Sequence, residues 1–143
     1  MLQGLFGLLY VLVAPVWIVM LLFPRADFTR RTVTSNWPFI ILGGTQAVLI
    51  LAALTGVPAQ QLGISAQAFR ALLLGDWGLL AVWAQILTLN LFAGVWIFRD
   101  SGFYGIRPAP HLLLTHFTGP VGLAVYLLLR RRAERRSTFR TLN

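Results

Sequence analysis

Four long apolar stretches constrain the fold of this chain more than any other feature of its sequence. A helix needs about 20 mainly apolar residues to cross a bilayer, because the hydrocarbon core is about 30 Å thick and each residue rises about 1.5 Å. Stretches of about this length and composition occupy residues 4–23, 38–54, 77–98 and 111–129. We therefore predict an all-α fold, an integral membrane bundle of four transmembrane helices within residues 1–129.

The composition also indicates a membrane protein. Hydrophobic residues make up 57% of the 143 residues and charged residues only 11%, whereas about a quarter of a soluble domain is charged. The chain contains no cysteine, which excludes disulfides, thiolate nucleophiles and thiolate metal sites. Between the second and third apolar stretches, "SAQAFRALLLGD" (residues 65–76) predicts a short amphipathic helix that lies in the membrane interface.

Arginine supplies all of the positive charge. Six of the twelve arginines lie in the last fourteen residues, directly after the fourth apolar stretch, where they can meet anionic lipid headgroups. We predict that residues 130–143 form a cytoplasmic tail, and we expect membrane lipids rather than nucleic acid as its partner. The predicted headgroup contacts are Arg130, Arg131, Arg132, Arg135 and Arg136.

Two topologies fit the placement of the arginines. With four spans, seven arginines share the side of the two termini and five lie on the other side, which favours cytoplasmic termini. Alternatively, the last segment is re-entrant, because "THFTGPVG" (residues 115–122) places Gly119, Pro120 and Gly122 at its middle. Eleven arginines would then share one side. Our prediction is four spans, in an inner, plasma or photosynthetic membrane.

The third apolar stretch carries two carboxamides, Gln85 and Asn90. A carboxamide donates and accepts hydrogen bonds but does not titrate, so it can hold a ligand or a neighbouring helix but cannot serve as an acid or base. Five residues at about 100° each place the two side chains about 140° apart, so we expect them to face different partners. The candidate ligand or helix contacts are Trp83, Gln85, Asn90, Gly94, Trp96 and His116.

The two histidines do not suggest a joint metal site. His111 and His116 are five residues apart and point about 140° away from each other on a helix, so no metal is expected. His111 follows "PAP" and is expected to be solvated at the interface. We expect His116 to bond a neighbouring helix, with a chlorophyll-type pigment as the alternative.

Charged residues also flank the ends of two spans. If the loops meet, Asp27, Arg30, Arg99 and Asp100 form an interfacial cluster on the side opposite the termini. The simpler interpretation is a set of surface ion pairs that contribute about 0–1 kcal/mol each. The alternative is a catalytic pair of carboxylates.

Three stretches of the sequence resemble a known family. "APVWIVMLLFPRADFTRRTV" (residues 14–33), "WAQILTLNLFAGVWIFRD" (residues 83–100) and "FTGPVGLAVYLLLR" (residues 117–130) are similar to the ABA DEFICIENT 4-like family of small four-span membrane proteins. Plant members are implicated in forming neoxanthin from violaxanthin, an epoxide-to-allene isomerisation of a carotenoid. The family pattern often has histidine, aspartate and a basic residue where this chain has Gln85, Asn90 and Val95, while Asp100 is retained.

The resemblance and the departures together lead to two hypotheses about function. Because the proton-transfer candidates within the third stretch are replaced, we expect a non-catalytic subunit that binds carotenoid or lipid. It would lie at the edge of a larger, photosynthetic membrane complex, beside other membrane subunits. The alternative is a carotenoid isomerase that acts on a xanthophyll epoxide, in which Asp27 and Asp100 would carry the proton transfers.

Overall fold

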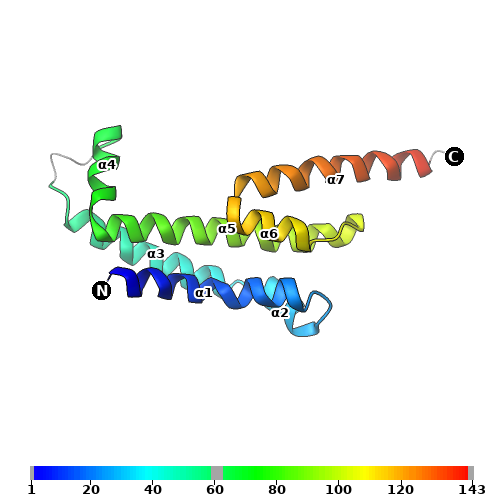
Figure 1. Ribbon diagram of the computed structural model, residues 1–143, viewed down its shortest axis with the longest axis horizontal. Helices are drawn as coiled ribbons and strands as arrows, with labels where there is room; N and C mark the ends of the chain where they lie inside the picture. Colours follow the sequence, from blue (N-terminus) through cyan, green and yellow to red (C-terminus); the bar gives the residue numbers. More distant parts are fainter. Residues whose placement is uncertain (1, 59–62, 142–143) are drawn as a thin grey trace. The chain divides into compact units, whose positions relative to one another are not determined.

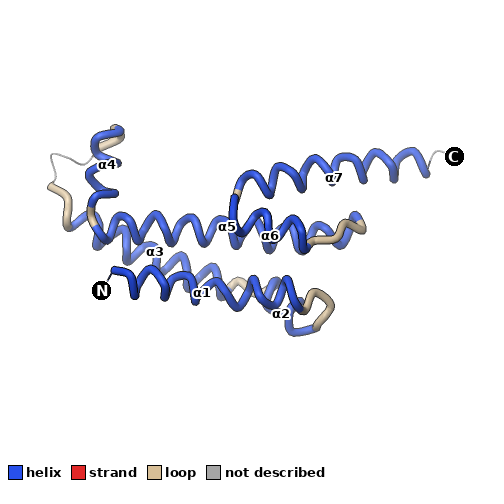
Figure 2. Tube along the Cα trace, viewed as in Figure 1, coloured by secondary structure: helices blue, strands red, loops and turns tan. Residues whose placement is uncertain are grey.

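The computed structural model describes the backbone of residues 2–58 and 63–141, and the side chains of these residues as far as residue 135. All regular structure in this part of the chain is helical, which confirms the predicted all-α class (Figure 2). The helices, labelled in Figure 1, are α1 (Leu2–Leu22), α2 (Asp27–Thr34), α3 (Trp37–Thr55), α4 (Ala66–Leu74), α5 (Asp76–Tyr104), α6 (Ala109–Thr118) and α7 (Pro120–Thr141).

Three of these helices are long and apolar enough to cross a membrane. They are α1 with 21 residues, α3 with 19 and α5 with 29, and they coincide with the first three predicted spans. Pro38 lies in the first turn of α3, where its missing N–H has no partner to lose. At about 1.5 Å per residue α5 is about 43 Å long, so its ends extend beyond a hydrocarbon core of about 30 Å. The presence of these three helices supports the conclusion that the chain is a membrane protein.

The chain divides into two compact units. The first comprises Met1–Ala14 and Asn36–Thr88, and the second comprises Pro15–Ser35 and Leu89–Asn143. Helices α1 and α5 each contribute residues to both units.

The first unit is held together by apolar packing between α1, α3 and α5. The Phe6 and Trp83 rings stack with centroids 4.4 Å apart and planes 8° from parallel. The helix predicted between the second and third spans is present as α4, and the Ser65 hydroxyl caps it by accepting from the Ala68 N–H at 3.1 Å. The buried apolar residues of this unit are Leu9, Val13, Leu42, Leu49, Ala53, Leu80, Ala81, Ala84 and Leu87.

The second unit contains the turn between α1 and α2. The Thr29 side chain is fully buried, and its hydroxyl donates to the Phe23 carbonyl at 2.6 Å and approaches the Val19 carbonyl at 3.3 Å. The Val19 carbonyl lies near the end of α1 and the Phe23 carbonyl just after it, and each also accepts a backbone N–H, from Phe23 and Ala26 respectively. Thr29 therefore fixes α2 against the end of α1.

The prediction that residues 111–129 form a single transmembrane helix is wrong. The segment 111–129 is divided between α6, which ends at Thr118, and α7, which begins at Pro120. Gly119 between them has φ +55° and ψ −103°, a conformation that excludes a continuous helix. With only 10 residues, α6 is about 15 Å long and reaches about halfway through a bilayer.

Helices α6 and α7 form a hairpin beside the C-terminal half of α5, in which the chain reverses direction at Gly119 (Figure 1). Gly119 lies against Asn90, and Tyr126, further along α7, bonds Asp100, further along α5. Helix α7 therefore runs in the same direction as α5, and α6 runs opposite to both. This arrangement matches the re-entrant alternative and leaves three long spans.

Candidate functional site

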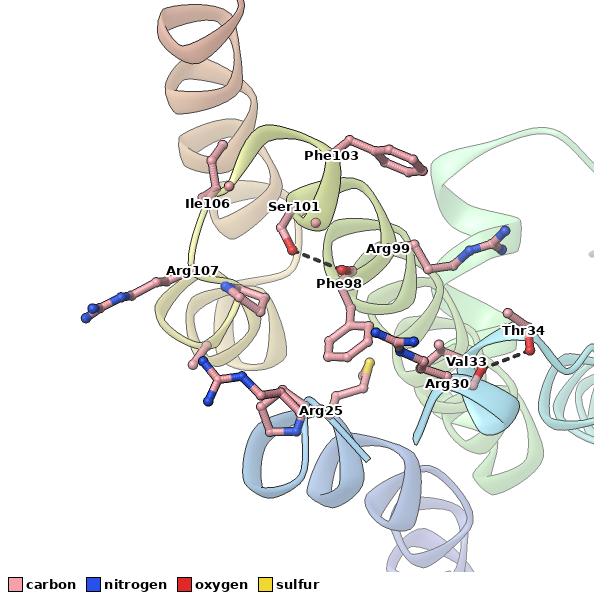
Figure 3. A pocket seen from close by; sticks show the side chains of 16 residues that line it. Arg25, Arg30, Val33, Thr34, Phe98, Arg99, Ser101, Phe103, Ile106 and Arg107 are labelled. Carbon is pink, nitrogen blue, oxygen red and sulfur yellow. Dashed lines mark hydrogen bonds between the residues drawn. The ribbon is translucent and has the colours of Figure 1, made fainter. Parts of the chain in front are cut away.

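A pocket of about 1040 Å³ opens where several helices of the second unit end (Figure 3). Its walls come from the end of α1, from α2, from the last turns of α5 and from the loop that leads into α6. Four arginines line it, so we name it the arginine pocket: Arg25, Arg30, Arg99 and Arg107.

The interior of the arginine pocket is apolar. Met20, Val33, Phe98 and Ile106 contribute side chains to its lining. Figure 3 shows Arg30 extending beside the Phe98 ring, whereas Arg99 and Arg107 extend outward on opposite sides. The pocket therefore combines an apolar floor with a positively charged rim.

The hydroxyl groups in the lining are engaged with backbone. Ser101 donates to the Phe98 carbonyl at 2.9 Å, and Thr34 donates to the Arg30 carbonyl at 2.8 Å (Figure 3). Such bonds stabilise the last turns of α5 and α2 and orient both hydroxyl protons toward the helices. The arginine side chains are thus the polar groups that remain to meet a ligand.

The described residues of the protein do not neutralise the four arginines. None of them forms an ion pair with a residue in the described part of the chain, and the lining contains no carboxylate. Because a guanidinium keeps its proton under all physiological conditions, the rim carries four positive charges. The site is therefore suited to binding an anion.

A second polar cluster lies beside the C-terminal half of α5, and we call it the Asp100–Arg130 network. The Arg130 Nε lies 3.3 Å from Asp100 Oδ2 and 3.2 Å from Glu134 Oε1. The Tyr126 hydroxyl donates to Asp100 Oδ2 at 2.6 Å. Arg130 also donates to the Tyr104 hydroxyl at 3.0 Å, which in turn donates to Glu134 at 2.9 Å.

The network attaches α7 to α5 over several turns. Tyr126 is fully buried, and its ring makes edge contacts with Trp96 and His111, at centroid distances of 5.7 and 5.5 Å. The Arg130 guanidinium lies 4.9 Å from the centre of the Tyr104 ring, a cation–π contact. The hydrogen bond to Tyr104, with smaller contributions from Asp100 and Glu134, raises the pKa of Arg130 above its ordinary value.

The turn of the hairpin depends on close backbone approach. A Cβ at Gly119 would lie 2.5 Å from the Asn90 Oδ1, so the Asn90 carboxamide occupies the space beside the turn. A Cβ at Gly122 would collide with the backbone nitrogen of Thr115, which is fully buried on α6. Asn90 and the small residues therefore shape the reversal between α6 and α7.

Gln85 lies in the first unit and contacts a different helix. Its Oε1 accepts a hydrogen bond of 3.3 Å from Gln46 Nε2 on α3. The indole N–H of Trp83, two residues earlier on α5, is buried without a hydrogen-bond partner among the described residues. The two carboxamides of the third span thus have separate surroundings: Gln85 bonds α3, and Asn90 lies at the hairpin turn.

The remaining candidates on α5 and α6 pack with aromatic rings of the second unit. A Cβ at Gly94 would lie 2.5 Å from the Trp17 ring, and His116 makes an edge contact with the same ring at 4.8 Å. The prediction that His111 is solvated is wrong, because the hairpin places it against Tyr126 and leaves it 7% exposed. No group of three potential ligands for a metal is found among the described residues.

The four residues of the predicted charge cluster do not meet at one site. Arg30 and Arg99 line the arginine pocket, whereas Asp100 pairs with Arg130. Asp27 is exposed in the first turn of α2. Of the tail residues, Arg130 belongs to the network, Arg131, Arg132 and Arg135 are exposed, and the Arg136 side chain lies outside the described residues.

Several residues of these sites were not among the candidates from the sequence. Arg25 and Arg107 line the pocket, Thr29 fixes its α2 wall, and Tyr126 bonds Asp100. The sequence could have indicated the two arginines as candidates, since each lies beside a proline just outside an apolar stretch. Thr29 and Tyr126 carry no such signal, because their roles depend on contacts that only the folded chain creates.

These features define a small helical membrane protein with three long apolar helices, a half-length helical hairpin and a pocket of ligand size. The chain belongs to the ABA DEFICIENT 4-like family, since the model of that family matches residues 4–126. This confirms the resemblance predicted from the sequence. No curated protein and no solved structure matches the chain.

Proposed function

We propose that this protein is a non-catalytic membrane subunit that binds an apolar ligand, a carotenoid or a lipid, beside other subunits of a larger assembly. The observation that carries the proposal is the chemistry of the arginine pocket. Its volume of about 1040 Å³ is slightly above the range of about 300–1,000 Å³ that ligand pockets typically have. Its apolar floor suits a hydrocarbon chain, and its charged rim suits a polar end.

The lining offers no acid–base pair for isomerisation. Opening an epoxide by isomerisation requires an acid that protonates oxygen and a base that removes a proton from carbon, both with pKa values near the working pH. The 16 residues that line the pocket include no carboxylate, histidine or tyrosine, and arginine does not release its proton. This chemistry supports binding rather than turnover.

Association with other subunits is supported by the outer faces of the helices. Large apolar side chains are strongly exposed on α3, α5 and α6, for example Val48, Phe92 and Phe117. In a membrane such faces contact lipid tails or other helices, and close packing then decides which neighbour is preferred. The carotenoid chemistry of plant relatives favours an assembly that carries carotenoids, and hence a photosynthetic one.

One observation favours the alternative, a carotenoid isomerase. Tyr126 and Asp100 form a short hydrogen bond of 2.6 Å, the kind of pair that can pass a proton. However, Tyr126 has no exposed surface, and both groups are occupied in attaching α7 to α5. A substrate would reach them only if α7 moved away, so the binding function has the stronger support.

The test is to extract the protein from its membrane together with bound molecules and to identify those molecules. We expect a carotenoid or lipid at a fixed molar ratio, and no product when an epoxy-carotenoid is added. Gly102→Leu should reduce retention, because Gly102 lines the pocket and has open space for a side chain. Gly44→Leu is the matched control, because Gly44 also has open space but lies on α3, which contributes no residue to the pocket lining.

Two results would contradict the proposal. Conversion of an epoxy-carotenoid by the purified chain would support the isomerase instead. Equal retention by the Gly102→Leu and Gly44→Leu variants would show that the ligand does not occupy the arginine pocket.

A further inference from the structure

We infer that the arginine pocket binds the anionic headgroup of a lipid, with the first part of the acyl chains on its apolar floor. This inference rests on the proposed function and narrows its ligand from a carotenoid or lipid to an anionic lipid. The observation behind it is that four arginines line one pocket: Arg25 in the turn after α1, Arg30 on α2, Arg99 near the end of α5 and Arg107 in the loop before α6.

The positive charge of the rim favours an anionic ligand. Like charges around one cavity repel one another, and the protein provides no carboxylate partner for any of the four guanidinium groups among its described residues. The nearby Asp100 is not available, because it is engaged with Arg130 and Tyr126. A bound anion would relieve this repulsion, and a guanidinium matches a phosphate, sulfate or carboxylate with two parallel hydrogen bonds.

The apolar floor identifies the anion as part of a larger molecule. Met20, Val33 and Phe98 would contribute nothing to holding a small inorganic ion, and the volume of about 1040 Å³ exceeds what such an ion fills. A carotenoid would match the floor but carries no charge for the rim. A lipid with an anionic headgroup matches both parts of the lining.

The position of the pocket agrees with this ligand. Arg25 follows the end of α1 by three residues, and Arg99 lies five residues before the end of α5. The apolar helices end at this level, which is where the headgroups of a bilayer lie. A lipid could therefore enter from the membrane with its chains already in hydrocarbon.

The experiment uses the full chain, extracted from membranes in lipid discs, with the bound lipids counted by mass spectrometry. We expect about one anionic lipid per chain in the wild type, and at least fivefold less in the double variant Arg25→Gln/Arg30→Gln. The matched control is Arg31→Gln/Arg70→Gln, which removes the same charge from exposed positions of α2 and α4 that do not line the pocket. Thermal unfolding of both variants verifies that they are folded.

The possible outcomes distinguish a lipid headgroup from a free anion, and they distinguish a failure of this inference from a failure of the proposed function. Retention of phosphatidylglycerol in preference to phosphatidylcholine with the same chains supports the inference, and displacement by millimolar inorganic phosphate overturns it in favour of a free-anion site. A carotenoid or neutral lipid retained equally by both double variants overturns the inference but leaves the proposed function intact. If the wild type retains no apolar molecule, both fail.

Discussion

Gly119 ends α6 directly against the carboxamide of Asn90, so the reversal of the chain lies beside the middle of α5. Two independent features make glycine necessary there. The backbone has φ +55°, which L side chains rarely adopt, and the Asn90 Oδ1 occupies the space of a Cβ. The hairpin therefore depends on one residue that has no side chain and on one carboxamide that fills its place.

Gly119→Ala should destabilise the protein by about 1–3 kcal/mol, because it combines a strained backbone with a collision. Unfolding in a denaturing detergent measures the loss. Adding Asn90→Ala should recover only part of it, since the collision disappears while the backbone strain remains. The control is Gly44→Ala, which meets open space on α3. Equal stability of the two alanine variants would show that the reversal tolerates a side chain.

Tyr126→Phe should cost about 1.5–3 kcal/mol, the typical contribution of a hydrogen bond to a charged group. The substitution removes the bond to Asp100 but keeps the ring contacts with Trp96 and His111. Tyr126→Ala should cost more, because it also leaves a cavity. Unfolding measured on both variants separates the two contributions. A phenylalanine variant as stable as the wild type would mean that the Asp100 bond has no role in holding α7.

The hairpin predicts that the loop before α6 and the start of the arginine-rich segment lie on the same side of the membrane. Because the chain has no cysteine, single cysteines can report this directly. In intact cells an impermeant maleimide should label Gln67→Cys but should label Arg107→Cys and Arg131→Cys only after lysis. All three positions are exposed. If the maleimide labelled position 107 but not position 131 in intact cells, the four-span topology with both termini in the cytoplasm would be correct instead.

The Gln46–Gln85 hydrogen bond should contribute little to stability. Bonds between polar side chains of membrane helices average about 0.6 kcal/mol in double-mutant cycles. A cycle with Gln46→Leu, Gln85→Leu and the double variant measures the coupling between α3 and α5. A coupling above about 2 kcal/mol would indicate that the bond is part of a larger polar network.

The three long spans could be predicted from the sequence because a lipid environment leaves few choices. A backbone in hydrocarbon must satisfy its own hydrogen bonds, so a run of about 20 apolar residues becomes a helix. The same reasoning fails for residues 111–129, since their apolarity suits a single span and a hairpin equally well. The signal for the hairpin was Gly119 followed by Pro120, which lacks a backbone N–H and is unfavourable in the interior of a helix.

The partners of the charged residues could be predicted much less well. Arg99 is the nearest cation to Asp100 in the sequence, but consecutive residues on a helix point about 100° apart. The partner is Arg130, thirty positions along the chain, and it comes close only because α7 returns beside α5. The error for His111 has the same cause, since its burial depends on Tyr126 from the returning helix.

The half-length of α6 also has a consequence for biogenesis. A hairpin that enters and leaves the bilayer on one side requires no translocation of any hydrophilic segment after α5. Of the twelve arginines, only Arg70, which precedes α5, would then have to pass through the insertion machinery to the far side. The chain would insert with eleven charges remaining on the ribosomal side, so its last step is a folding event within the membrane and not an export event.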